Sequence, residues 1–245
     1  PGQEAPRAWS LIGPYGSGKS AFSLFLSKLL SEGSEQSHEA ALKVLGKADK
    51  HLAKIFRKHV EGGSGYLQVL VTGSPEPMGT RLLKGLADAA ESYWAARPGR
   101  KPAIIGKLEK ALEEPVSASK LVSLVDALQT QVVKAGGAGV LLVIDELGKF
   151  LEYEARHYGA NDIYILQALA EHAYKGGQAN FLLFVLLHQS FEQYAKGLGE
   201  NLKNEWSKVQ GRFEEVPFLE SAEQVLRVVA AAFSHTFDQS ENQVV

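Results

Sequence analysis

The 245-residue sequence contains no cysteine, only one methionine and no uninterrupted run of about 18 apolar residues, the length that would suggest a membrane span. Without cysteine the chain can form neither disulfide bonds nor thiolate metal sites. The missing apolar run argues against a membrane-spanning helix, and the start PGQEAPRAWS lacks the basic and apolar regions of a secretory signal. We therefore expect a cytoplasmic protein.

An excess of either charge is also missing, because 26 Lys and Arg residues oppose 28 Asp and Glu residues, for a net charge of -2. The chain as a whole lacks the basic character of a nucleic-acid-binding protein, so any such surface must be local. Its hydrophobic content of 45% is enough for a full core in one large domain. Because the chain begins at Pro1 and not at methionine, we expect it to be part of a longer protein.

Near-continuous apolar runs predict four buried strands of a parallel sheet, and a shorter run predicts a fifth. The predicted strands are residues 8–13, 66–73, 139–146, 180–189 and 214–218. Helical patterns lie between them, at residues 20–30, 38–60, 80–96, 105–112, 117–134, 163–174 and 193–208. Strands that alternate with helices predict an α/β fold with right-handed crossovers and helices on both faces of the sheet.

A glycine-rich segment, LIGPYGSGKS, follows the first predicted strand and matches G-x-x-x-x-G-K-[ST]. Glycines let backbone N–H groups converge on phosphate oxygens, and the following helix directs its positive end at the same anion. In this motif Lys19 reaches the β and γ phosphates, and the Ser20 hydroxyl is a ligand of Mg²⁺. The residues predicted to contact the nucleotide are Gly13, Pro14, Tyr15, Gly16, Ser17, Gly18, Lys19, Ser20 and Ala21.

Two adjacent carboxylates, Asp145 and Glu146, end the third predicted strand after four apolar residues. Open α/β sheets bind ligands at the carboxyl ends of their strands. Two buried carboxylates are costly unless a cation or hydrogen bonds compensate them. We therefore predict that Asp145 binds Mg²⁺ through water and that Glu146 orients or deprotonates the attacking water.

Together these segments resemble the Walker A (Gly13–Ser20) and Walker B (Leu141–Glu146) motifs of P-loop ATPases. The Asp-Glu pair resembles the class that includes the AAA+ and STAND-like proteins. Over about residues 9–230, the resemblance implies a Mg²⁺-dependent ATPase with a three-layer sandwich and a five-stranded, mainly parallel sheet in the order 5-1-4-3-2. It further implies an ATPase core at 1–220, a helical insertion at about 74–138 and the start of a lid or linker helix at 221–245.

The resemblance also implies two further site residues. In AAA+ proteins a polar residue that ends the fourth strand, called sensor 1, contacts the γ-phosphate or positions the water. Gln189 is the first choice for this role and His188 the second, because the register of the strand is open. An arginine before the fifth strand reaches the γ-phosphate of the neighbouring subunit, and Arg212 stands at that place. This implies a homo-oligomer, a ring or a dimer, with Arg212 acting in trans; the alternative is a surface ion pair with Glu214 or Glu215.

The same sequence features fit other functions. Asp145–Gly148 also reads D-x-x-G, but no N-K-x-D segment follows the fourth strand, which favours adenine over guanine. One alternative is a phosphotransferase that acts on a small acceptor, with the basic segment Arg97–Lys101 as its lid. Another is a nucleotide-binding scaffold with negligible hydrolysis.

The predicted helix at 38–60 separates an apolar stripe from a basic side. The stripe consists of Leu45, Ala48, Leu52 and Ile55, and the basic residues are Lys43, Lys47, Lys50, Lys54, Arg57 and Lys58. The basic side is either a solvated surface or a contact for nucleic acid or an acidic partner. The run IDELGKFLEY resembles ATPases of large prokaryotic multidomain proteins, including phage-defence systems, in which hydrolysis drives assembly or remodelling.

Overall fold

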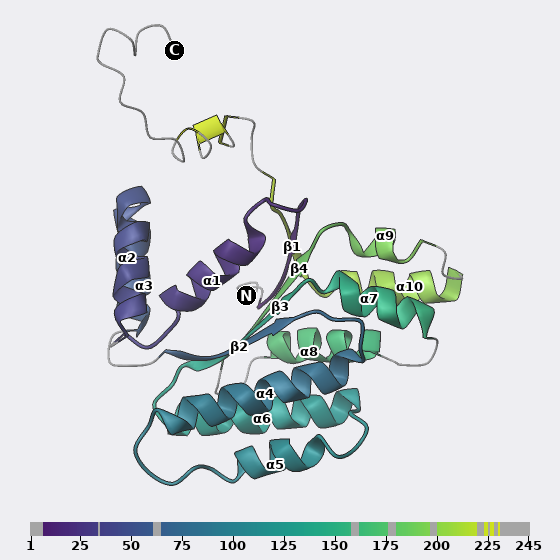
Figure 1. Cartoon of the computed structure of the whole chain (residues 1–245), viewed down its shortest axis with the longest axis horizontal. Coiled ribbons are helices and arrows are strands. Elements are labelled where there is room, and N and C mark those ends of the chain that lie inside the picture. The colour runs from purple at the N-terminus through teal and green to yellow at the C-terminus, as the bar shows by residue number, and fades with distance from the viewer. Residues whose placement is uncertain are drawn as a thin grey trace, which may run out of the picture.

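Five parallel strands form the central sheet of the computed structural model (Figure 1). The structure describes residues 7–219 except 34, 61–64, 158–161, 176–179 and 197–199, together with 223, 224, 226, 227 and 230. The strands are β1 (Ala8–Ile12), β2 (Tyr66–Thr72), β3 (Gly139–Asp145), β4 (Asn180–Leu187) and β5 (Glu214–Pro217). Their order is β2-β3-β4-β1-β5, which is the predicted order 5-1-4-3-2 read from the other edge. The predicted P-loop sandwich is confirmed.

The inner strands of the sheet are buried on both faces, which explains why they are continuously apolar. Side chains of β3 alternate between the two faces. Leu142 and Ile144 belong to the large core that includes residues of α4, α6 and α8, whereas Leu141 and Val143 pack in a second core with Leu30. A strand with one face in water would need polar residues at every second position, and β3 has none before Asp145.

Helices cover the two faces (Figure 1). On one side lie α1 (Lys19–Leu29), α2 (Gln36–Ala48) and α3 (Lys50–Val60). On the other side lie α4 (Met78–Ala95), α6 (Ala118–Lys134) and α8 (Asp162–Lys175), with α5 (Ile104–Ala111) packed on α4 and α6. The remaining helices are α7 (Gly148–Arg156), α9 (Phe191–Tyr194) and α10 (Glu200–Gln210). Among the described residues, no helix is long and apolar enough to cross a bilayer.

The prediction of one continuous helix at 38–60 is wrong, because the chain forms two helices that meet at Asp49. The backbone of Asp49 is extended, with φ -148° and ψ 104°. Its Oδ1 atom accepts a hydrogen bond from the N–H of Leu52 at 2.9 Å, so Asp49 caps the start of α3. The predicted apolar stripe is divided accordingly, and Leu52 and Ile55 are 38% and 50% exposed.

The predicted helix at 193–208 is likewise divided, into α9 and α10. Gly197 and Gly199 lie between them in the sequence, and glycine disfavours a continuous helix. Three helices, α4, α5 and α6, lie where the helical insertion is predicted. The predicted lid or linker helix at 221–245 lies largely outside the described residues, so the division into an ATPase core and a lid stays a prediction.

Candidate functional site

The glycine-rich loop connects β1 to α1 at the edge of the sheet where the strands end. Gly16 and Gly18 have φ angles of 78° and 88°, in the left-handed region that favours glycine. Gly13 is needed for a different reason, because a Cβ atom there would lie 2.2 Å from the carbonyl oxygen of Phe218. The predicted motif glycines therefore have backbone reasons for being glycine.

Several backbone donors of this loop have no partner. Helix α1 begins at Lys19, and its N-cap residue Gly18 offers no side-chain acceptor. Within the described part of the chain, the N–H groups of Gly18, Lys19 and Ser20 donate to no protein acceptor. Unpaired donors at the positive end of a helix dipole are the arrangement that binds phosphate groups.

The side chain of Lys19 lies inside the loop and is only 5% exposed. Its Nζ atom donates to the carbonyl oxygens of Gly13 at 2.6 Å and Pro14 at 2.7 Å, and to Ser17 Oγ at 3.3 Å. Burial lowers the pKa of Lys19, and the charge of Asp145 acts in the opposite direction. This electrostatic interaction joins the loop to the carboxylates at the end of β3.

The turn after β3 holds Asp145 and Glu146 in an unusual backbone conformation. Glu146 has a φ angle of 54°, and among the described residues other than glycine it is alone in having a positive φ. The left-handed region costs a residue with a Cβ atom about 1 kcal/mol. Asp145 Oδ1 accepts a hydrogen bond from the N–H of Glu146 at 2.8 Å, which helps to hold this turn.

Lys149 forms an ion pair with Glu146 that the sequence analysis did not predict. The hydrogen bond to Glu146 raises the pKa of Lys149. Glu146 lies two residues before α7 in a left-handed conformation, so the turn, and not helical spacing, brings the two side chains together. The sequence therefore carried no clear signal for this pair.

Gly73, directly after β2, also contacts this turn. Its N–H donates to the carbonyl oxygen of Asp145 at 2.8 Å. A Cβ atom on Gly73 would lie 2.1 Å from the carbonyl oxygen of Glu146. The end of β2 therefore supports the backbone of the two carboxylates, and the sequence alone assigned Gly73 no role.

The end of β4 brings His188 to the site. Its ring stacks on the ring of Tyr15, with centroids 3.4 Å apart. Both ring nitrogens are buried and have no hydrogen-bond partner among the described residues. Burial lowers the pKa of His188, as does the charge of Lys19, while the carboxylates after β3 oppose this shift. Gln189, the first choice from the sequence, is exposed, and its role in the site stays a prediction.

Ser20 and Asp145 are the residues predicted to hold a metal ion. Within the described ranges, no group of three or more His, Cys, Asp or Glu residues could hold one. The assignment of Ser20 and Asp145 as metal ligands therefore stays a prediction.

A cavity of about 510 Å³ lies beside the phosphate loop, within the size range of sites for small molecules. Its lining includes Gly13, Pro14, His188, Ser190 and Leu219, from the ends of β1, β4 and β5. The cavity therefore joins the start of the phosphate loop to the ends of β4 and β5.

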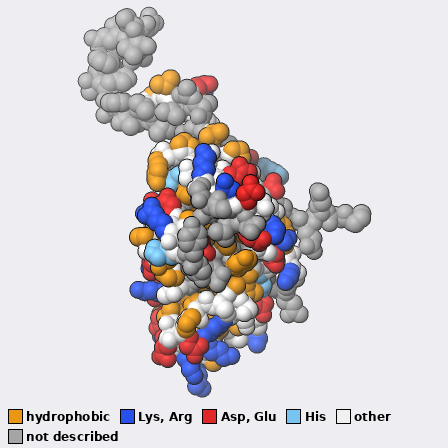
Figure 2. Space-filling model, turned by 90° about the vertical axis from the view of Figure 1, so that its right-hand side faces the viewer, with side chains coloured by type: hydrophobic (Ala, Val, Ile, Leu, Met, Phe, Trp, Pro, Cys, Tyr) orange, Lys and Arg blue, Asp and Glu red, His pale blue; other side chains and the backbone are white. Residues whose placement is uncertain are grey.

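Arg212 lies where the strands begin, and the phosphate loop lies where they end. Arg212 precedes β5, whose Glu214 pairs with Trp9 near the beginning of β1, whereas the loop follows the end of β1. An Nη atom of Arg212 is 3.1 Å from Glu171 of α8, so the partners suggested from the sequence, Glu214 and Glu215, are wrong. On the face around α7, α9 and α10, acidic and basic side chains are interspersed (Figure 2).

The structure also contradicts the predicted lid at Arg97–Lys101. The Arg97 guanidinium lies 3.4 Å from the centre of the Tyr93 ring and 2.7 Å from Glu32. The Tyr93 hydroxyl would lie 2.6 Å from a Cβ atom on Gly137, which precedes β3. Arg97 is therefore at the edge where the strands begin, away from the phosphate loop.

Comparisons with known proteins add little to this geometry. No protein-family model matches the sequence, and no curated protein matches it. Among solved structures, the chain is similar to the ORC2 protein of Aeropyrum pernix, which was solved as ADPNP-ADP complexes. The TM-score is 0.49 and the identity 13%, over 92% of this chain and 45% of that one. The chain thus spans less than half of that protein, and the fold assignment rests on the strand order and the phosphate loop.

The contact of Gly73 with the Glu146 backbone predicts that Gly73→Ala lowers the free energy of unfolding by about 1 to 3 kcal/mol. Gly106→Ala is the matched control, because a Cβ atom there meets nothing within 4 Å and Gly106 lies in helix α5. The control should raise the free energy of unfolding by about 0.5 to 1 kcal/mol. Urea unfolding followed by circular dichroism measures both, and equal effects would contradict the close packing.

Proposed function

We propose that this chain is an ATP-binding, Mg²⁺-dependent ATPase module of the AAA+-like type. One observation carries the proposal. Three features lie together where the strands end: a phosphate loop with unpaired N–H donors, the buried Lys19 and the pair Asp145–Glu146. A loop alone would indicate only phosphate binding. The adjacent carboxylates add the groups that hydrolysis requires.

In this proposal the loop residues Gly13–Ala21 bind the phosphates, and Lys19 contacts the β and γ phosphates. Ser20 and Asp145 hold Mg²⁺, which supplies positive charge against the phosphates. The cavity beside Pro14 and His188 receives the adenosine. The chain's own contribution is to position these groups on rigid strand ends.

Glu146 is the proposed base or water-positioning group. Its ion pair with Lys149 and the left-handed turn restrict the directions that its carboxylate can take. His188 and Gln189, at the end of β4, are the candidates for the polar group that contacts the γ-phosphate. The buried, unpaired ring nitrogens of His188 favour it for this role.

Hydrolysis is favoured over phosphate transfer to a small acceptor. The segment proposed as a lid over such an acceptor, Arg97–Lys101, lies where the strands begin, away from the phosphate loop. Phosphate release from ATP without an added acceptor distinguishes the two reactions. The same measurement tests the third function, a scaffold, for which turnover would equal the background rate.

We further propose that the module belongs to a larger, cytoplasmic, oligomeric protein that couples nucleotide state to assembly or remodelling. The setting suggested by IDELGKFLEY is prokaryotic phage defence. The position of Arg212 supports oligomerisation. Because it lies at the strand beginnings, away from the phosphate loop of its own chain, it is suited to complete the site of a neighbouring subunit.

Glu146→Gln should leave ATP binding intact and slow turnover by at least about a hundredfold, the scale for loss of a positioned base. Fluorescent-nucleotide titration and phosphate release measure the two properties. Glu152→Gln, an exposed glutamate on α7, is the control and should change neither. Near-normal turnover of Glu146→Gln would rule out its role in activating water.

If Arg212 acts in trans, specific activity should rise with protein concentration, and Arg212→Ala should lose this rise. Mixing Arg212→Ala with Lys19→Ala should restore part of the activity, because one variant supplies the intact loop and the other the intact arginine. Arg156→Ala, an exposed arginine at the end of α7, serves as the control. Specific activity that does not depend on concentration, together with no recovery on mixing, would exclude shared sites.

Contact with nucleic acid remains a separate prediction, based on the exposed basic residues of α2 and α3. These are Lys43, Lys47, Lys50, Lys54, Arg57 and Lys58, of which Arg57 is paired with Glu39. DNA or RNA should then stimulate hydrolysis, and the effect should fall steeply with salt. Combined Lys50→Gln, Lys54→Gln and Lys58→Gln changes should abolish it, whereas Lys107→Gln with Lys110→Gln on α5 should not. Stimulation that the first variant retains would exclude this surface.

A further inference from the structure

Strand β2 is an edge of the sheet, and its backbone offers unpaired hydrogen-bonding groups. Alternate residues of a parallel strand direct their N–H and C=O groups to opposite sides. The Tyr66 N–H points away from β3, because it donates to Leu30 at 2.9 Å, whereas the Gly73 N–H points toward β3 and Asp145. Gln68, Leu70 and Thr72 share the outward direction of Tyr66, and their N–H groups have no backbone acceptor among the described residues.

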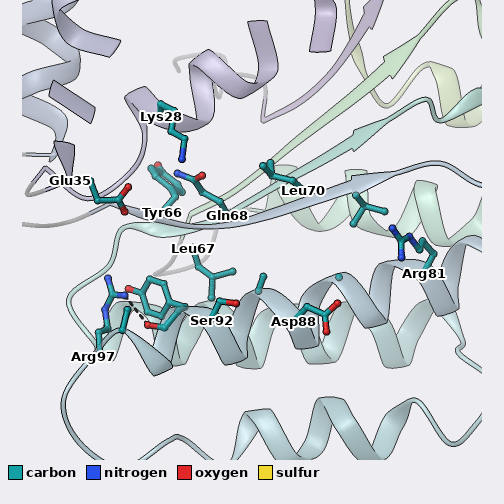
Figure 3. Close-up of a pocket in the computed structure, with 15 residues that line it drawn as sticks. Lys28, Glu35, Tyr66, Leu67, Gln68, Leu70, Arg81, Asp88, Ser92 and Arg97 are labelled. Atoms are coloured by element: carbon teal, nitrogen blue, oxygen red, sulfur yellow. Dashed lines mark hydrogen bonds between the residues drawn. The ribbon is translucent and has the colours of Figure 1, made fainter. Parts of the chain in front are cut away.

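A groove of about 490 Å³ follows this edge (Figure 3). Its lining includes Gln68 and Leu70, on the face of β2 toward α1, and Leu67 and Val71, on the face toward α4. A cavity that contacts both faces of one strand must pass around its free edge. We call this cavity the β2 groove; its walls are Lys28 and Glu35 on one side and residues 81–97 on the other.

Small residues of α4 form much of the second wall. Gly85, Ala89, Ser92 and Ala96 line the groove at spacings of three and four, so they share one face of the helix. Gly85 also permits the close approach of α4, because a Cβ atom there would lie 2.6 Å from Val71 Cγ2. Short side chains leave the space beside β2 open.

The β2 groove has charges of both signs along its lining, from Lys28, Glu35, Arg81, Asp88 and Arg97. Two of the lining side chains bear most directly on a bound segment. Leu70 is 46% exposed beside the free backbone, and it can cover an apolar side chain of a bound segment. Arg81 lies at the opposite end of the groove from Arg97 (Figure 3). The Nε atom of Arg81 is buried without a hydrogen-bond partner, and none of the ion pairs among the described residues involves Arg81. Arg81 as a whole is only half-buried, but a buried N–H donor without an acceptor is unfavourable, and an anion bound here would satisfy it.

We propose that the β2 groove binds an extended peptide segment of a partner protein, which adds a strand beside β2 and places an acidic side chain against Arg81. Free backbone groups at a sheet edge recognise an extended peptide through main-chain hydrogen bonds, and flanking pockets select its side chains. A second copy of this chain fits less well, because its own β2 lies between walls of the same kind. This site is separate from the phosphate loop and extends the proposed ATPase function.

The test uses the full chain and a phage-displayed library of random nonapeptides, selected on the wild type and counter-selected on Leu70→Pro. Proline at this position removes the outward N–H without removing a bond to β3, so an edge strand can accept it. Leu70→Ala keeps the N–H and loses only the side chain, so it should weaken binding less than Leu70→Pro does. Circular dichroism checks that each variant is folded.

The selected peptides should contain Asp or Glu and should bind the wild type saturably when labelled with fluorescein. Arg81→Gln should weaken binding at least about tenfold, the scale for loss of a hydrogen bond to a charged group. Lys84→Gln, an exposed lysine on the same helix that is outside the groove lining, should not. Methylation of alternate peptide nitrogens should weaken binding by a similar factor, and this result does not depend on the folding of Leu70→Pro.

Three results would each overturn the proposal. The first is that no peptide is enriched on the wild type over Leu70→Pro or, if that variant is unfolded, over Arg81→Gln. The second is that the bound peptides respond neither to Arg81→Gln nor to backbone methylation. The third is that sedimentation shows a dimer of the chain that Leu70→Pro converts to monomer, because the groove would then serve a second copy.

Discussion

The end of β4 lies between the two loops of the candidate site and is hydrogen-bonded to both. The N–H of Gly13 donates to the carbonyl oxygen of Leu187 at 3.1 Å, and the N–H of Leu147 donates to that of Leu186 at 3.1 Å. Two adjacent residues of one strand therefore set the position of the phosphate loop and of the carboxylate turn. A shift of this strand by one residue would turn its side chains to the other face and separate the two loops.

The turn after β3 depends on this arrangement. The positive φ of Glu146 is unfavourable in isolation, and three neighbours hold it: the Asp145 carboxylate, the Lys149 ammonium and the backbone at Gly73. Backbone strain of this kind persists where the surroundings restrict the conformation, and it is frequent at functional sites. The strain is consistent with the proposed role of Glu146 in positioning water.

The groups with different proposed roles lie at opposite ends of the strands. The strand ends carry the groups that would bind and hydrolyse ATP, while Arg212 lies where the strands begin. The free side of β2 is a third surface, and it is not remote from the site, because Gly73 at the end of β2 contacts the Glu146 turn.

Local signals in the sequence were sufficient for the sheet and the motifs. Near-continuous apolar runs predicted four strands and a shorter run predicted the fifth, and the resemblance carried by the Gly13–Ser20 loop and the Asp145–Glu146 pair implied the observed strand order. These features depend on short segments, in which burial on both faces or a left-handed glycine restricts the choice of residue. The break at Asp49 was missed although it is local, because one capping hydrogen bond outweighs helix periodicity there.

Tertiary structure decided which side chains share the site. The sequence ranked Gln189 before His188, whereas the structure stacks His188 on Tyr15 of the phosphate loop. The sequence also missed Lys149 as the partner of Glu146 and Glu171 as the partner of Arg212. It also assigned nothing to Gly73 or to the free edge of β2. Apart from Lys149, each of these depends on strand register and on packing between segments far apart in the chain, and neither can be read from the periodicity of one segment.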